Sequence, residues 1–293
     1  MKTAKVITWA ILTTLIALAT LSSTTLGITG NSQPDTTPYV GVVVLFNNEG
    51  NAIGYCSGVL ISSNVMLTSG HSTFEAASVR VCFDKGSIKY DIQNGKIILP
   101  DTEKIYSGTP ITYPEYALSV LAGSNKGNNF YSSSDVGLIV LDQPVPVTEV
   151  TPYAALPSEN SVEGLQTKTN LQVIGYGVQT QITPKNHGVE NSWVGTISCN
   201  SAQNQLISGN FVGSDKYLKL SANAAQNKGG VAFGDSGGPV IYTNSEGQDV
   251  VLGVSAYVSN SNCAGVTYHT RIDSTSILGW ISDALIKYHL ETI

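Results

Sequence analysis

Short apolar runs, rich in β-branched residues and separated by turns of glycine, asparagine and serine, make up most of this chain from residue 39 onward. Runs of this length, bounded by turn residues, are typical of β-strands. The pattern therefore predicts an all-β protein built from many short strands. The expected strands are residues 39–46, 57–61, 65–68, 78–83, 96–99, 171–177, 193–199, 217–220, 240–242 and 250–258.

The C-terminal segment is the place where apolar residues recur with helical spacing. Asp273 or Ser274 can cap the expected helix. Its apolar stripe consists of Ile277, Trp280, Ile281, Ala284, Leu285 and Tyr288. Such a stripe is typical of core packing, so we assign it no catalytic role. A proline-rich segment at 143–159 is expected to link the two halves of the chain.

The first 27 residues have the pattern of a secretory signal peptide. Lys2 and Lys5 precede an apolar stretch at 6–18, which is too short and too polar for a membrane span. Cleavage after Gly27 and cleavage after Ala19 both fit, and the latter would leave a short propeptide at 20–27. The alternative is an N-terminal membrane anchor. We expect a secreted, extracellular protein, periplasmic in a Gram-negative bacterium, with no stable membrane insertion.

Composition narrows the possible partners. The chain is 42% hydrophobic and only 12% charged, which favours a packed globular protein over a disordered one. Its formal net charge is −6 and it has no polybasic patch, so we expect no nucleic-acid partner.

Four cysteines, Cys56, Cys82, Cys199 and Cys263, fit an oxidising compartment. Three disulfide pairings are open, and free buried thiols are the alternative. The cysteines are too widely spaced for a zinc motif. We expect no metal and no cofactor.

A glycine-rich turn at 234–239, Gly-Asp-Ser-Gly-Gly-Pro, carries the strongest chemical signal. A nucleophilic serine needs an exposed hydroxyl and backbone N–H groups converging on the oxygen of the group it attacks, and glycines allow this backbone. His71 ends an apolar segment, and Asp135 begins another. The order His71, Asp135, Ser236 is that of chymotrypsin, not of subtilisin or the α/β-hydrolases.

In this order the motifs resemble those of the trypsin/chymotrypsin family of serine proteases. The matching stretches are CSGVLI at 56–61, LTSGH at 67–71, YPEY at 113–116, DVGLIVL at 135–141, IGYG at 174–177 and the identical GDSGGP at 234–239. The resemblance implies a peptidase domain over 28–293 with two six-stranded antiparallel Greek-key barrels. The first is expected at about 28–145, and the second, with the C-terminal helix, at about 160–293.

The resemblance also implies roles for individual residues. Ser236 would be the nucleophile, His71 the general base and acid, and Asp135 the residue that orients the imidazole. The N–H groups of Gly234 and Ser236 would form the oxyanion hole. Asp235 would pair with a new N-terminal ammonium, and Ile28 resembles the first residue of the family's mature chains. Polypeptides would be the substrates, and protein protease inhibitors are further expected partners.

The sequence departs from the family at the cysteines and around the substrate pocket. The usual partner of Cys56 is replaced by Ser72, so the resemblance leaves Cys82 as its nearest partner. Cys199 would then pair with Cys263.

For the pocket, the resemblance implies lining residues Gly230, Ser255, Tyr257 and His269. Gly230 stands where trypsin has an aspartate, which disfavours Arg or Lys substrates because a buried cation would lack a partner. Tyr257 in place of a glycine would narrow the pocket, so that it would favour small substrate residues. His269 would recognise an acidic side chain near the pocket floor or, alternatively, pack within its strand.

Two other functions remain to be weighed. One is a catalytically silent relative that only binds, against which the intact set His71, Asp135 and Ser236 argues. The other is a GDS-type lipase, whose serine would lie near the N-terminus of an α/β chain, and neither feature is present here.

Overall fold

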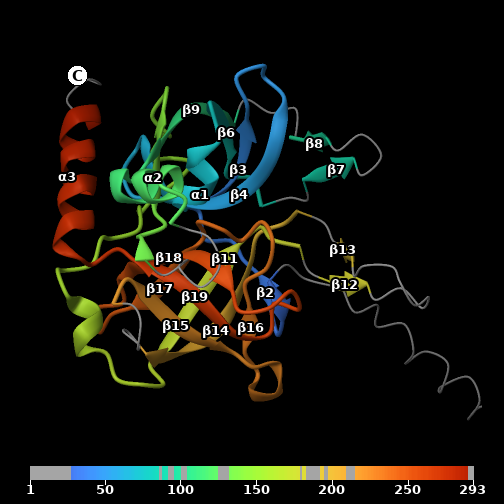
Figure 1. Cartoon of the computed structure of the whole chain (residues 1–293), viewed down its shortest axis with the longest axis vertical. Helices are drawn as coiled ribbons and strands as arrows, with labels where there is room; N and C mark the ends of the chain where they lie inside the picture. Colours follow the sequence, from blue (N-terminus) through green and yellow to red (C-terminus); the bar gives the residue numbers. More distant parts are fainter. Residues whose placement is uncertain are drawn as a thin grey trace, which may run out of the picture.

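The computed structural model describes residues 28–85, 88–91, 96–99, 104–124, 132–178, 180–182, 192–194, 197–208 and 215–289. Two antiparallel barrels lie one above the other in Figure 1, and a C-terminal helix runs beside the upper one. The expected all-β class with two six-stranded barrels is confirmed. The expected signal peptide at 1–27 lies outside the described residues.

The first barrel is closed in the strand order β10-β5-β4-β3-β6-β9. Its interior is filled by fully buried apolar side chains, among them Val42, Val59 and Leu138. Burying each such side chain stabilises the fold by about 1.5–3 kcal/mol. The strands are β3 (Val40–Phe46), β4 (Ala52–Leu60), β5 (Val65–Thr68), β6 (Ser78–Cys82), β9 (Ile105–Thr112) and β10 (Gly137–Leu141).

The second barrel runs β11-β17-β18-β19-β15-β14 and closes through pairing of β11 with β14. Its core includes the buried residues Leu171, Leu218, Leu220 and Val240. Its strands are β11 (Asn170–Gly175), β14 (Asn200–Ser208), β15 (Tyr217–Ala222), β17 (Pro239–Thr243), β18 (Asp249–Val258) and β19 (Gly265–Arg271).

Short elements complete the described structure. The helices are α1 (Gly70–Phe74), α2 (Pro114–Leu121) and α3 (Thr275–His289), with 3-10 turns η2 (Ser161–Gly164) and η3 (Ala224–Gln226). Two-residue strands are β1 (Thr29–Gly30), β2 (Gln33–Pro34) and β16 (Gly229–Gly230). Two hairpins pair β7 (Lys89–Asp91) with β8 (Lys96–Ile98) and β12 (Thr180–Ile182) with β13 (Ser192–Val194).

Both ends of the described chain cross between the barrels. Residues 28–34, which we expected in the first barrel, pair with the second: β1 joins β16, and β2 joins β14. The helix α3, which we grouped with the second barrel, also packs on the first: Ile277 and Ile281 belong to a buried apolar cluster made mostly of first-barrel residues, and Trp280 contacts Tyr113. Each end of the described chain therefore contacts the barrel that the rest of its own half does not form.

The region at 143–159 is irregular, as expected of a link, but Val145 and Val150 are buried against the first barrel. Among the described residues, none of the helices combines the length and apolar character needed to cross a bilayer.

Candidate active site

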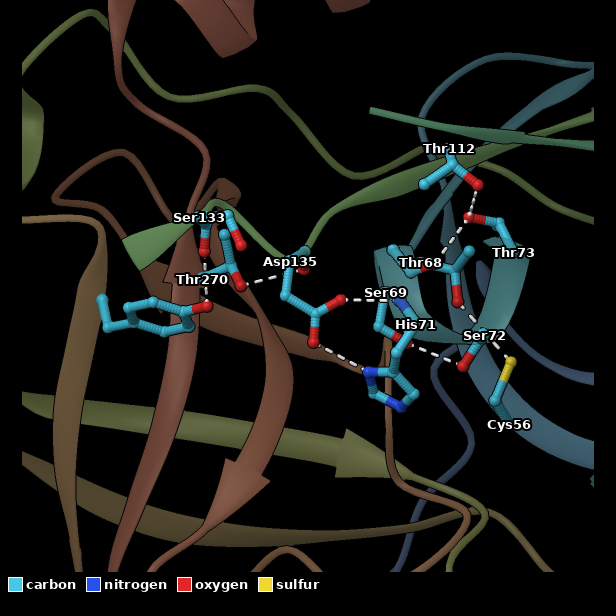
Figure 2. Close-up of polar contacts among 12 residues, drawn as sticks. Cys56, Thr68, Ser69, His71, Ser72, Thr73, Thr112, Ser133, Asp135 and Thr270 are labelled. Carbon is cyan, nitrogen blue, oxygen red and sulfur yellow. Dashed lines mark hydrogen bonds and ion pairs between the residues drawn. The ribbon is translucent and has the colours of Figure 1, made fainter. Parts of the chain in front are cut away.

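The register of the first barrel brings His71 to Asp135. His71 lies in α1 directly after β5, and Asp135 lies just before β10, which pairs with β5. Oδ2 of Asp135 lies 2.7 Å from Nδ1 of His71, and Oδ1 accepts the main-chain N–H of His71 over 2.7 Å (Figure 2). Because an ionised carboxylate only accepts hydrogen bonds, Nδ1 carries the proton and Nε2 is left with its lone pair.

Opposing effects act on the pKa of His71. Burial lowers the pKa, but the negative charge of Asp135 and its hydrogen bond raise it, and the net result is a pKa above 6.5. The side chain of Asp135 is only 9% exposed, whereas that of His71 is 38% exposed. The carboxylate is therefore shielded while the imidazole remains accessible.

Side chains of the second barrel hold the loop that carries Asp135. The Thr270 hydroxyl donates to the main-chain oxygen of Asp135 over 2.9 Å, and the Tyr217 hydroxyl donates to that of Ser133 over 2.7 Å. Thr270 and Ser133 are labelled in Figure 2. Both donors are buried. Nothing in the sequence singles out Thr270 or Tyr217, because isolated hydroxyl residues in strands are common.

Ser236 lies in the turn between β16 and β17, and two glycines shape this turn. Gly234 has φ +97°, and a Cβ there would lie 2.5 Å from the ring of Tyr55. Gly237 has φ +77°, and a Cβ there would lie 2.1 Å from the hydroxyl oxygen of Thr68. A larger residue at either position would have a strained backbone, and its Cβ would overlap the neighbouring atoms. Both positions therefore require glycine.

Ser57 of β4 joins this turn to the first barrel. Its N–H donates to the main-chain oxygen of Ser236 over 2.8 Å, and its hydroxyl donates to that of Gly234 over 2.8 Å. The N–H groups of Gly234 and Ser236, by contrast, donate to no acceptor within the described part of the chain. Ser57 was not predicted as a site residue, although it lies inside the CSGVLI motif.

Asp235, next to Ser236 in this turn, is fully buried. Its carboxylate accepts the N–H of Gly177 over 2.7 Å and that of Ala232 over 2.8 Å. Burial raises the pKa of Asp235 to about 7, although these two hydrogen bonds oppose the shift. Ile28 is also fully buried, in the core of the second barrel.

Two cavities meet at His71, Phe233 and Ser236. The first, here called the β18 cavity, has a volume of about 240 Å³ and is otherwise walled by residues 231–232 and 255–258 of the second barrel. The second, here called the β4 cavity, has a volume of about 500 Å³. Its walls include Leu45, Ile53, Tyr55, Ile97 and Val178. His71 and Ser236 therefore line the same two spaces.

The sequence matches the trypsin family model over residues 28–281. The chain belongs to the trypsin family.

A curated relative supports this assignment: kallikrein 1-related peptidase b11 of Mus musculus is 26% identical over 242 residues, covering 79% of this chain and 80% of its own. Among solved structures, HL collagenase superposes with a TM-score of 0.59 at 18% identity, covering 87% of this chain and 96% of its own. At that identity the likeness shows the fold alone. This trypsin-family chain is thus a serine-type endopeptidase.

The structure places the expected pocket residues in two groups. Ser255 and Tyr257 line the β18 cavity, whereas Gly230 and His269 are not among its lining residues. Gly230 pairs with Thr29, and a Cβ on it would lie 2.7 Å from the main-chain oxygen of Cys263.

His269 is fully buried behind the pocket wall. Its Nδ1 lies 3.1 Å from the hydroxyl of Ser255, and its Nε2 lies 2.9 Å from that of Thr267. Burial lowers its pKa to about 3, so the ring is neutral. A charged imidazole that recognises acidic substrates is therefore disfavoured. The alternative, in which His269 packs within its strand and bonds to neighbouring hydroxyls, fits these contacts.

The expected disulfides of this trypsin-family chain are absent from the structure, where all four cysteines are buried free thiols. Cys56 pairs with Val43 and Cys82 with Val42, on opposite sides of β3. They are thus two strands apart, about 10 Å, and on opposite faces of the sheet. A disulfide requires Cα atoms within about 7 Å, so this pairing is wrong. Cys199 and Cys263 are likewise unbridged.

Proposed function

We propose that this protease hydrolyses peptide bonds through an acyl-enzyme formed on Ser236. His71 takes the proton of the Ser236 hydroxyl during attack on the scissile carbonyl and then gives it to the leaving amine. Water next attacks the acyl-enzyme, with the same imidazole accepting and returning the proton. The observation that carries the proposal is the pair of hydrogen bonds between His71 and Asp135. The ring and the main-chain N–H of His71 both contact the carboxylate of Asp135.

The shared cavities support the pairing of His71 with Ser236. Among the described residues no hydrogen bond joins the His71 ring to the Ser236 hydroxyl, although both border the same two cavities. Contacts between base and nucleophile are often long in a free enzyme and shorten when substrate binds. We therefore expect this hydrogen bond to form in the complex with substrate.

The unengaged N–H groups of Gly234 and Ser236 are suited to bind the oxygen on which negative charge develops. The carbonyls of Gly234 and Ser236 both accept hydrogen bonds from Ser57, which fixes the orientation of their peptide units. Loss of one such donor costs about 3 kcal/mol of transition-state stabilisation in comparable sites.

We further propose that the chain is secreted and that processing before Ile28 completes the site. A new ammonium at Ile28 would pair with Asp235, whose burial otherwise favours the uncharged carboxyl. Because Gly27, and not Arg or Lys, directly precedes Ile28, a trypsin-like activator is disfavoured. N-terminal sequencing of the active enzyme is expected to begin at Ile28, and any other first residue contradicts this step.

The substrates proposed are polypeptides, with protein inhibitors as natural competitors for the same cavities. The described residues that line the β18 cavity include no Asp or Glu. An Arg or Lys side chain entering it would leave water without gaining a counter-charge. We therefore expect the residue on the amino-terminal side of the scissile bond to have an uncharged side chain of small or medium size.

Organophosphate labelling tests the mechanism. The processed enzyme is expected to incorporate one label, at Ser236, and to lose activity in step with labelling. Ser236→Ala should bind no label, whereas Ser259→Ala, which removes an exposed serine, should retain full labelling and activity. Absence of labelling in the folded, processed wild-type protein would instead support a catalytically silent binding protein.

A further inference from the structure

The β4 cavity is a second substrate-sized space beside Ser236, and its walls are uncharged and mainly apolar. None of the described residues that line it is Asp, Glu, Lys or Arg. Among the described residues, two of the few large apolar side chains that are exposed, Ile53 at 46% and Phe233 at 56%, border this cavity. Exposed apolar side chains that gather at one concave site indicate a ligand surface.

The position of this cavity fixes which part of a substrate can fill it. It shares His71, Phe233 and Ser236 with the β18 cavity, but its remaining walls come mainly from β4 and β3 of the first barrel. A peptide that places its acyl part against β18 must cross Ser236 to enter the β4 cavity. The chain beyond the scissile bond is then the part that enters.

Phe233 lines both cavities. Its main-chain oxygen accepts the N–H of Val178 over 2.8 Å, which fixes the backbone while more than half of the residue stays exposed. Val178 itself lines the β4 cavity. The ring can therefore contact a substrate side chain on either side of the scissile bond without any movement of the nucleophile turn.

We propose that the β4 cavity binds a large apolar side chain on the leaving-group side of the scissile bond. The enzyme would accordingly prefer substrates with Leu, Ile or Phe directly after the cleaved bond. This inference rests on the proposed function, because it assumes that Ser236 attacks the carbonyl between the two cavities. Partial burial of such a side chain corresponds to a preference of about tenfold in kcat/KM.

The test compares substrates that share one acyl half, chosen by cleavage of a mixed peptide library. Two are peptides that differ only by Leu or Asp directly after the scissile bond. The third is the methyl ester of the acyl half, whose leaving group, methanol, is too small to fill the cavity. We expect the enzyme to hydrolyse the ester and to cleave the Leu peptide about tenfold faster than the Asp peptide.

A matched pair of surface variants locates the preference. Ile53→Glu places a carboxylate at the cavity wall and should reduce the Leu-to-Asp ratio to about one. Val147→Glu changes an exposed apolar residue, 63% exposed, that does not line the cavity, and should leave the ratio unchanged. Ester hydrolysis with no Leu preference, or a ratio unaffected by Ile53→Glu, would overturn this inference alone. A wild-type enzyme that hydrolyses neither ester nor peptide would overturn the proposed function and this inference with it.

Discussion

The ring of Tyr217 packs edge-on against that of Tyr257, with ring centroids 5.3 Å apart. Tyr257 lines the β18 cavity, whereas the hydroxyl of Tyr217 donates to the main-chain oxygen of Ser133, two residues before Asp135. Burial raises the pKa of Tyr217, so its hydroxyl stays protonated and remains a donor. One side chain thus links the wall of the substrate cavity to the loop that positions the carboxylate.

Replacing Tyr217 by Phe tests this link. The ring contact with Tyr257 is kept, but the buried carbonyl of Ser133 loses a donor, which costs about 1–3 kcal/mol. We expect kcat to fall about tenfold with KM nearly unchanged, because Asp135 holds His71 less firmly. Weaker contact with Asp135 should also move the acid limb of the pH–rate profile to lower pH.

Tyr39→Phe is the matched control. The Tyr39 hydroxyl donates to Asp249 over 2.7 Å and is not part of the candidate site. Its loss should lower the midpoint of urea unfolding without a change in kcat. Equal effects of the two variants on kcat would show that Tyr217 contributes only to stability.

The pKa of His71 sets the acid limit of activity. Only the neutral imidazole can accept the serine proton, so kcat/KM should rise with pH through a midpoint above 6.5. In Asp135→Asn the negative charge that raises the pKa is gone. The midpoint should then move to lower pH, and the residual rate should be lower by about 10⁴ because the tautomer is no longer fixed. A midpoint that stays in place in Asp135→Asn would contradict this account of His71.

Much of the fold could be predicted from the local sequence pattern. Two strands that were missed show the limit of such prediction. The apolar segments at β3, β5, β6 and β11 were expected, as was α3. Strand β9 was missed because Gly108 and Pro110 interrupt its pattern. In the barrel, Gly108 is required by close packing, since a Cβ there would lie 2.7 Å from the main-chain oxygen of Val140.

Strand β14 was missed for a different reason, because its sequence, NSAQNQLIS, is mostly polar. Its Asn204 is fully buried, and the side-chain amide donates to the main-chain oxygen of Gly229 over 2.7 Å. Such a long-range contact gives the buried amide nitrogen a partner but leaves no trace in the periodicity of the sequence. The roles of Ser57 and Thr270 were hidden for the same reason.

Tyr257 is expected to limit the size of the residue that precedes the scissile bond. Its ring stacks on that of Tyr268, with centroids 4.6 Å apart, and occupies one wall of the 240 Å³ β18 cavity. Tyr257→Ala should enlarge this cavity and raise the relative kcat/KM for Phe over Ala at that position by at least tenfold. Cleavage-site profiling of a peptide library measures the change.

Tyr242→Ala provides the comparison for Tyr257→Ala. Tyr242 is a half-buried tyrosine of β17 outside the β18 cavity, and its removal should leave the cleavage profile as it is in the wild type. If Tyr257→Ala also left the profile unchanged, the β18 cavity would not be the site that selects this residue.

The buried carboxyl of Asp235 predicts that stability depends on pH before processing at Ile28 but not after it. Without an ammonium, its folded pKa of about 7 exceeds the value of 3.8 expected when unfolded. The folded chain then binds more protons between these values, so its stability falls as pH rises from about 4 to 7, by at most about 4 kcal/mol. In a chain that begins at Ile28, the ammonium stabilises the carboxylate and this loss should vanish. Urea unfolding across pH 4–8, with Ser236→Ala in both chains to prevent self-cleavage, measures the two slopes.

Asp235→Asn separates this electrostatic effect from packing, because it removes the charge and keeps the shape. In the unprocessed chain it should abolish the fall in stability above pH 4, since no buried carboxyl remains to be ionised. In the chain beginning at Ile28 it should destabilise the fold at pH 8, because a buried ammonium would lose its counter-charge. The same change in unfolding midpoint in both chains would show that the Ile28 ammonium does not reach Asp235, and the activation step proposed here would fail.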